Sequence, residues 1–188
     1  MTVEWTTELH DQLDWHWQNL VRPKMEGLTD DEYLWEPVDG CWTVRSRKGD
    51  DEPGTGPYTI DWAYPEPAPP PVTTIAWRLG HIIVGVFGAR TASHFGGPEI
   101  DYSTFAYAGT ADEAMKQLDD VYANWIAGVR SLDADGLARP CGPAEGPYAK
   151  SPLAALVLHI NREAIHHSAE ILLLRDLYRR AGTSRLAG

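Results

Sequence analysis

The sequence predicts an all-α fold: a four-helix bundle of the up-down-down-up type, with a long irregular connection between helices 1 and 2. Three observations predict it. Four segments have helical periodicity, no strand pattern is convincing, and a Pro- and Gly-rich stretch over about 45–72 supplies the one long crossover connection. The 188 residues suit a single domain over 1–188 that is long enough to bury a core.

The first predicted helix runs from about Val3 to Met25 and is followed by a much shorter one. Apolar residues recur along the first helix at three- and four-residue steps, as an amphipathic helix requires: Trp5, Leu9, Leu13, Trp17 and Leu20. In the stretch GLTDDEYLWEP, Thr29 and Glu32 have the spacing of a capping box. The short helix that they begin should stop before Pro37.

The irregular segment that follows is dense in Pro and Gly, in GDDEPGTGPY and YPEPAPPPV, and cannot form regular helix. A connection of this length in a compact domain is usually functional or mobile. It also carries Trp62 and Tyr64. These rings either pin the segment to the body of the protein or contact a ligand, and the sequence leaves both readings open.

Three long helices follow. The range Thr73–Phe95 is apolar nearly all round and should be the most buried. The next, about Thr110–Leu132, opens on an N-cap with Glu113 three residues on. The last, about Ser151–Arg180, has Pro152 at its first position.

The last helix contains LHINREAIHHSAEI, with three histidines and two glutamates. At about 100° per residue, His167 projects into the apolar stripe. Glu163 lies one turn earlier at the edge of the stripe, while His159 and His166 point towards the rim and Glu170 is intermediate. A carboxylate placed there needs a cation, a metal or a proton. A hydrogen-bonded Glu–His pair in the core is the alternative.

The second long helix carries His81 in WRLGHIIVGVFG, with Trp77, Gly85 and Gly88 on the same side. Glycine costs up to about 1 kcal/mol inside a helix, so a local reason is expected. Either the glycines allow close packing, or they leave space for a ligand.

If the buried faces of the second and fourth helices meet, His81, Glu163 and His167 form a three-ligand site with open positions, which is typical of a catalytic metal. Nitrogen and oxygen ligands without thiolate suit Zn²⁺, Ni²⁺ or Fe²⁺.

Composition excludes other classes of protein. The formal charge of −11 disfavours nucleic-acid binding, and the basic run RSRK is followed at once by DDE. No apolar run approaches the roughly 18 residues of a membrane span. Cys41 and Cys141 form no metal or redox motif, and the N-terminus has no export signal. A reducing, cytoplasmic location is expected.

Two motifs, AWRLGHI and EAIHHSAEI, together with the early LTDDEYLWEPVDGCWTV, resemble the DinB-like superfamily. Its relatives include mycothiol-dependent maleylpyruvate isomerases and bacillithiol S-transferases. The resemblance spans nearly the whole chain and implies a four-helix bundle that holds a metal, usually Zn²⁺ or Ni²⁺. The implied ligands are His81, Glu163 and His167, and the isomerase branch is similar in having Glu at the second position. Dimers are common in that family, so a homodimer is compatible with the resemblance, although the sequence leaves the quaternary state open.

The resemblance also implies thiol chemistry, in which the metal holds a mycothiol-type thiol as thiolate for attack on a small electrophile. We therefore expect a metal-dependent S-transferase that acts in detoxification. A metal-dependent hydrolase and a non-enzymatic metal-containing stress or binding protein are the alternatives. Arg78 could bind a substrate carboxylate or pair with an acidic residue, and His166 could support the site or lie at its rim. The aromatic candidates for the pocket, each with core packing as its alternative, are Trp62, Tyr64, Trp77 and His16.

Overall fold

The computed structural model describes residues 3–185, with side chains to residue 181, so both ends of the predicted domain 1–188 lie outside it. The chain is mostly helical, as predicted. Four long helical segments account for most of it: α1 (Trp5–His16) continued by the π-helical turn Trp17–Val21 and α2 (Arg22–Met25); α4 (Ile75–His81) continued by the π-helical turn Ile82–Gly88 and α5 (Ala89–Phe95); α6 (Ala111–Arg130); and α8 (Leu153–Arg185). Three short helices lie between them: α3 (Asp30–Tyr33), α7 (Ala134–Ala138) and a 3₁₀ helix, Pro143–Tyr148.

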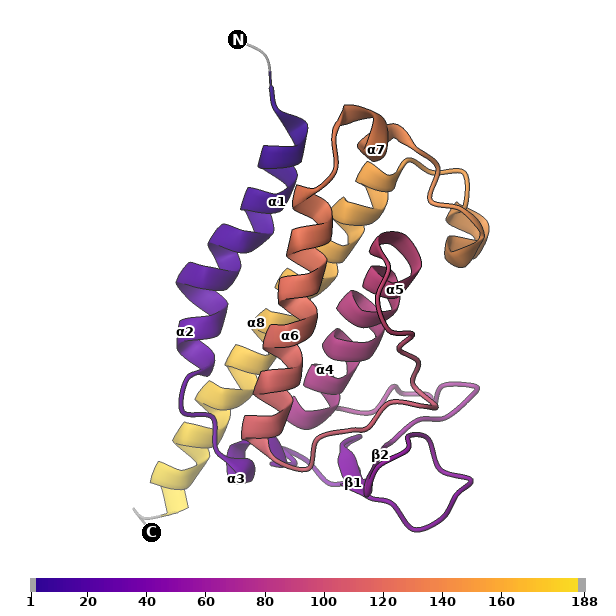
Figure 1. Ribbon diagram of the computed structural model, residues 1–188. Coiled ribbons are helices and arrows are strands. Elements are labelled where there is room, and N and C mark those ends of the chain that lie inside the picture. Colours follow the sequence, from indigo (N-terminus) through magenta and orange to yellow (C-terminus); the bar gives the residue numbers. More distant parts are fainter. Residues whose placement is uncertain (1–2, 186–188) are drawn as a thin grey trace.

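The directions of the four segments follow the predicted up-down-down-up order, and a long connection joins the first two, but the crossover lies elsewhere than we expected. Figure 1 shows α1/α2 and α8 running towards the end of the molecule that carries α3, while α4/α5 and α6 run the opposite way. The connection from α2 to α4 therefore stays at one end. Residues 96–110, and not the segment 45–72, run back along the molecule from the end of α5 to the start of α6.

A small antiparallel sheet corrects the prediction that the chain contains no strands. It pairs β1 (Val44–Ser46) with β2 (Tyr58–Ile60), and Val44 lies opposite Ile60. Both of these side chains are buried. A Cβ atom at Gly80 of α4 would lie 2.9 Å from Cδ1 of Ile60, so the missing side chain lets the hairpin rest on α4, one residue before His81. Three-residue strands are too short to show the alternation that identifies a strand in a sequence.

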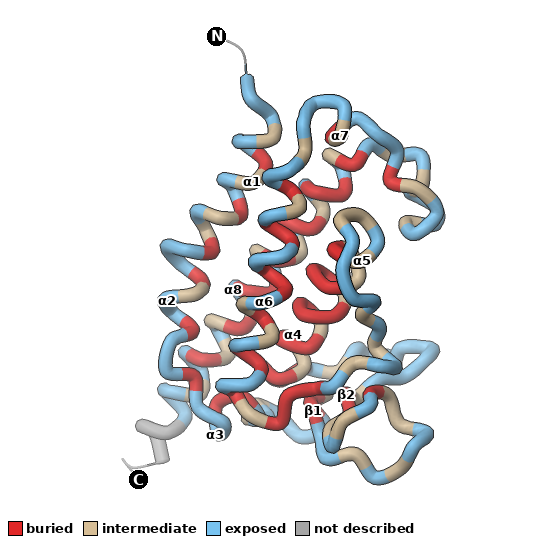
Figure 2. The backbone as a smooth tube through the Cα atoms, viewed as in Figure 1, coloured by how far each residue is buried: buried red, intermediate tan, exposed pale blue. Residues whose placement is uncertain are grey.

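The core lies where the inner faces of the four segments meet, and buried residues follow these faces (Figure 2). Trp17 stacks on Tyr122 of α6 with ring centroids 4.2 Å apart and meets the edge of Phe87 at 5.9 Å. The Asn161 side chain donates to the Leu9 carbonyl at 2.7 Å and ties α8 to α1. Trp5, which we placed on the buried face of the first helix, is instead 65% exposed.

Local sequence signals set several helix ends. Thr29 and Glu32 form the predicted capping box, and the Thr110 side chain accepts from the Glu113 backbone N–H. At the second long segment Thr74, one residue later than expected, is the N-cap. Among residues 3–185, no helix combines the length and the apolar character that crossing a membrane requires.

Candidate metal centre

The second and fourth long segments meet, as the predicted site requires. Helix α4 contacts α8, and the ring of His81 on α4 approaches the ring of His167 on α8 edge to face, with centroids 4.7 Å apart. His167 is buried, and His81 is partly buried. The polar groups predicted from two distant stretches of the chain therefore lie together in the folded protein.

His167 has a carboxylate at each ring nitrogen. Nδ1 lies 2.7 Å from Oε2 of Glu170, a hydrogen-bond distance. Nε2 lies 3.6 Å from Oε2 of Glu163, which is beyond one. In the tautomer with the proton on Nδ1, that N–H donates a hydrogen bond to Glu170. The lone pair of Nε2 is then directed towards Glu163.

His81 is held by an aromatic neighbour on each side. Its Nδ1 lies 2.7 Å from the hydroxyl of Tyr102, in the 96–110 connection, and its ring stacks on Trp77 with centroids 5.5 Å apart. Burial lowers the pKa of His81 to about 4, and the neighbouring His167 and the positive charge of Arg78 add to this effect. At neutral pH the imidazole is uncharged, which is the form that binds a metal.

The structure explains why Gly85 and Gly88 follow His81 in the same helical segment. A Cβ atom at Gly85 would lie 2.2 Å from the Tyr102 hydroxyl. One at Gly88 would lie 2.6 Å from the Ile83 carbonyl oxygen and 2.9 Å from the Ile100 side chain. Of our two explanations, close packing is therefore correct. At Gly85 this packing also gives Tyr102 the room to reach His81.

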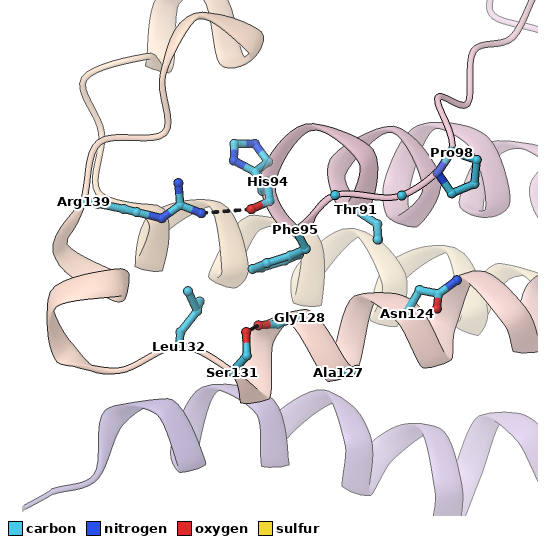
Figure 3. Close-up of a pocket in the computed structure, with 12 residues that line it drawn as sticks. Thr91, His94, Phe95, Pro98, Asn124, Ala127, Gly128, Ser131, Leu132 and Arg139 are labelled. Atoms are coloured by element: carbon cyan, nitrogen blue, oxygen red, sulfur yellow. Dashed lines mark hydrogen bonds between the residues drawn. The ribbon is translucent and has the colours of Figure 1, made fainter.

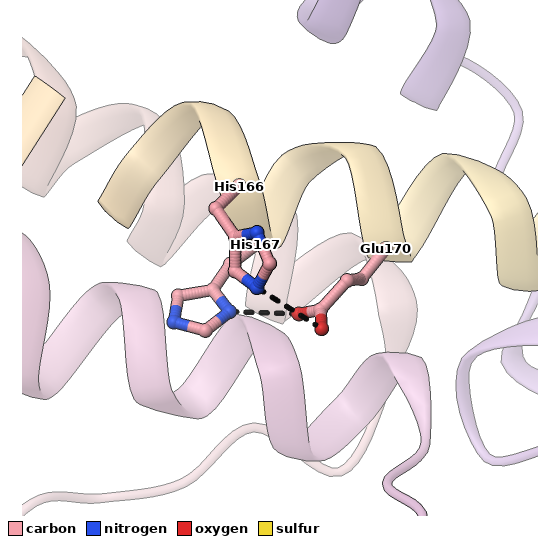
Figure 4. Close-up of side chains that lie close together, drawn as sticks. All are labelled: His166, His167 and Glu170. Atoms are coloured by element: carbon pink, nitrogen blue, oxygen red, sulfur yellow. Dashed lines mark hydrogen bonds and ion pairs between the residues drawn. The ribbon is translucent and has the colours of Figure 1, made fainter. Parts of the chain in front are cut away.

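The donor atoms that the structure brings closest together form a set that shares only His167 with the predicted one. Among the described residues, His166, His167 and Glu170 offer ligand atoms that all lie within 4.8 Å of one another (Figure 4). All three come from a single stretch of α8, and His166 is exposed. Our predicted set has Glu163 in contact with His167, but the same carboxylate also lies 3.5 Å from Nδ1 of His159.

Arg78 takes the ion-pair role that we gave as its alternative. Its Nε lies 3.1 Å from Oε2 of Glu170, and its NH1 lies 3.4 Å from Nδ1 of His167. A guanidinium group therefore stands on the Nδ1 side of His167, where it neutralises Glu170.

The other residues predicted to line the pocket differ in how far they are exposed to solvent. Trp77 is partly buried and donates its Nε1–H to the Asp61 carbonyl at 2.9 Å. Trp62 is 63% exposed, so it is not pinned in the core, and it stacks on the exposed ring of Tyr64 at 6.3 Å. Trp62 also lines an apolar cavity of about 240 Å³ together with Tyr102, the residue that contacts His81. His16 lies on α1, where its Nε2 is buried without a hydrogen-bond partner among the described residues.

Two contributors to this centre were not predicted. Tyr102 lies in irregular chain, where no periodicity indicates which way a side chain points. The helical period placed Glu170 between the buried face and the exposed face of its helix, which only partly indicated a role in the site. The period does not specify the side-chain rotamer that brings the carboxylate to His167.

The mostly helical fold and the cluster of imidazole nitrogens and carboxylate oxygens define a helical protein with a candidate site for a divalent metal. Residues 12–171 match the DinB superfamily, which includes metal-binding proteins, and the chain belongs to that superfamily. No curated protein and no solved structure matches the chain.

Proposed function

We propose that the chain is a four-helix-bundle protein that binds one divalent metal at His81, Glu163 and His167 and uses it for thiol S-transfer. One observation carries the metal assignment. The two facing imidazoles each have Nδ1 at 2.7 Å from a partner, Tyr102 for His81 and Glu170 for His167. Both Nε2 atoms are thus left for a metal, which is how ligating histidines are usually oriented in proteins. The Glu163 carboxylate, 3.6 Å from Nε2 of His167, completes the set.

The alternative set of His166, His167 and Glu170 fits a metal less well. It would use Nδ1 of His167, next to the Arg78 guanidinium, whose positive charge opposes a cation there. His166 is also exposed, and its Nε2 lies 3.4 Å from Oε1 of Glu170, which is the geometry of a surface i, i+4 pair. We assign Glu170 to orienting His167 and Arg78 to balancing the charge of Glu170.

The donor set of two imidazoles and one carboxylate favours Zn²⁺ or Ni²⁺, with Fe²⁺ as a further candidate, and leaves coordination positions open. A metal held by these residues would supply charge that stabilises the thiolate of a low-molecular-weight thiol of the mycothiol type, which is the nucleophilic form. Around it, Trp77 fixes the plane of His81 by stacking. The exposed Trp62 borders the apolar cavity beside Tyr102, and we assign that surface to the apolar part of an electrophile. The homodimer stays a prediction.

Elemental analysis of purified variants tests the ligand assignment. His81→Ala and Glu163→Ala should lose the metal, whereas the matched control His166→Ala should retain it. Retention in His81→Ala together with loss in His166→Ala would overturn the assignment in favour of the set within α8.

Activity is tested by titrating the metal-loaded protein with mycothiol or bacillithiol and a chlorinated arene, and by following consumption of the free thiol. Turnover that requires both the metal and the thiol supports S-transfer. Ester cleavage without thiol-dependent turnover would contradict it and would indicate a metal-dependent hydrolase. A metal-loaded protein with neither activity would contradict both enzymatic assignments.

A further inference from the structure

A cavity of about 630 Å³ lies between α5, the 3₁₀ helix Pro143–Tyr148 and the first turns of α8. Ionisable side chains from all three elements line it: Arg90, Glu145, His159 and Arg162. Its size suits a small organic molecule.

The charges of the lining favour an anion. The lining contains two guanidinium groups, of Arg90 and Arg162, and one carboxylate, of Glu145. Outside the lining, Nε of Arg162 also lies 3.6 Å from Glu163. That carboxylate is shared, because Oε1 lies 2.9 Å from Nε2 of His94 and 3.2 Å from Nε of Arg90. Glu145 is also the one ionic partner of Arg90 among the described residues, and the buried Nε of Arg90 makes no hydrogen bond there. Arg90 therefore keeps donors for a ligand, although the chain as a whole carries a formal charge of −11.

Two contacts connect this cavity to the candidate metal centre. On α8, Nδ1 of His159 lies 3.5 Å and Nε of Arg162 lies 3.6 Å from Oε1 of Glu163. Two residues that line the cavity thus contact the Glu163 carboxylate of the centre.

A neighbouring cavity lacks these properties. It has a volume of about 530 Å³ and lies between α5 and α6, with Phe95 and Asn124 among its lining residues (Figure 3). Its arginine, Arg139, donates to the His94 backbone carbonyl at 3.1 Å and none of its other lining residues is acidic or a second arginine. Arg139 therefore provides a control for charge removal close to, but outside, the larger cavity.

We propose that the cavity between α5 and α8 binds the carboxylate of a small organic anion through Arg90 and Arg162, next to the candidate metal centre. Guanidinium groups match carboxylates in both charge and geometry. The proposal rests on the proposed function in one respect: the bound anion is the electrophilic substrate of the metal-dependent reaction. The anion site itself does not require the metal.

The test uses benzoate as the probe and benzamide, an uncharged molecule of nearly the same shape, as its control. Isothermal titration calorimetry with the metal-free protein excludes direct coordination of the carboxylate to a metal. Benzoate should bind and benzamide should bind at least about tenfold more weakly, as expected when a charge-assisted hydrogen bond is lost. Equal binding of the two probes, or no binding of either, would overturn the proposal.

Variants locate the site. Arg90→Gln and Arg162→Gln should each weaken benzoate binding by about tenfold or more, whereas Arg139→Gln should leave it unchanged. Arg90→Lys keeps the positive charge. It should retain part of the affinity for benzoate, which would show that the loss in Arg90→Gln does not come from misfolding. An equal loss in all three Gln variants would contradict the assignment.

Metal content, measured on the same samples, separates the two proposals. If benzoate binds but the protein takes up no metal, the proposed function fails and the anion site stands. If the metal binds at His81, Glu163 and His167 but benzoate does not bind, the anion site alone fails.

Discussion

Replacing Tyr102 by phenylalanine removes the hydroxyl that lies 2.7 Å from Nδ1 of His81. Burial raises the pKa of this phenol to about 12, so it is a neutral hydroxyl at physiological pH. In the proposed centre Nε2 of His81 would bind the metal, and the hydroxyl oxygen accepts a hydrogen bond from Nδ1–H, which fixes the ring. Losing such a partner typically weakens metal binding by about 10–100-fold, which corresponds to about 1.4–2.7 kcal/mol.

Metal affinity is measured by competition with a chromophoric chelator, and Tyr107→Phe provides a matched control. The Tyr107 hydroxyl donates to the Tyr102 carbonyl, also at 2.7 Å, so this variant loses a hydrogen bond of the same length from the same segment. It leaves the hydroxyl that faces His81 in place. Both variants should lose about 1 kcal/mol of stability, but only Tyr102→Phe should bind the metal more weakly. Equal metal affinities in the two variants would refute the reasoning.

Three further predictions concern the supports of the fold and the centre. Arg175 and Glu32 are 1% and 5% exposed and form a two-point pair at 3.1 and 3.0 Å, so Arg175→Met should cost about 3–5 kcal/mol in urea denaturation, and adding Glu32→Met should restore much of it. A cost below about 1 kcal/mol would contradict a buried-pair role. Burial alone would raise the pKa of Glu32, but the bonds and charge of Arg175, together with the Thr29 backbone N–H and the charge of Arg179, hold that pKa below its ordinary 4.5. The contribution of the pair to the free energy of unfolding should thus be complete above pH 4.5 and should fall as the pH drops through the lowered pKa of Glu32. The double variant should lack this part of the pH dependence. Gly85→Ala should displace the Tyr102 hydroxyl and weaken metal binding as Tyr102→Phe does; unchanged affinity in the chelator competition would show that the contact is dispensable.

Helical periodicity predicted the buried face of α8 well. His167 is buried together with most of the predicted stripe, and His166 is exposed. The reason is that a long regular helix converts sequence spacing into direction. The same reasoning placed His81 and His167 on facing surfaces, because burying two apolar faces brings their helices into contact.

Features that depend on long-range contacts were beyond this reasoning. Arg78, from another helix, contacts both Glu170 and His167, and Tyr102 reaches His81 from irregular chain. The crossover was misplaced because a Pro-rich composition identifies an irregular segment but not the ends of the molecule that it joins. Trp5 fits the helical period but is exposed, so the period alone did not show where the buried face of α1 begins.

The proposed centre draws on helices from distant parts of the chain, with His81 on α4 and Glu163 and His167 on α8. Proteins are synthesised from the N-terminus at about 5–20 residues per second. During synthesis, His81 and Tyr102 leave the ribosome well before their partners on α8. A metal that needs all three proposed ligands can therefore be acquired only after α8 has emerged and packed against α1 and α4. Loading of the centre then reports that the last helix has docked, and a nascent chain stalled before α8 should take up no metal at this position.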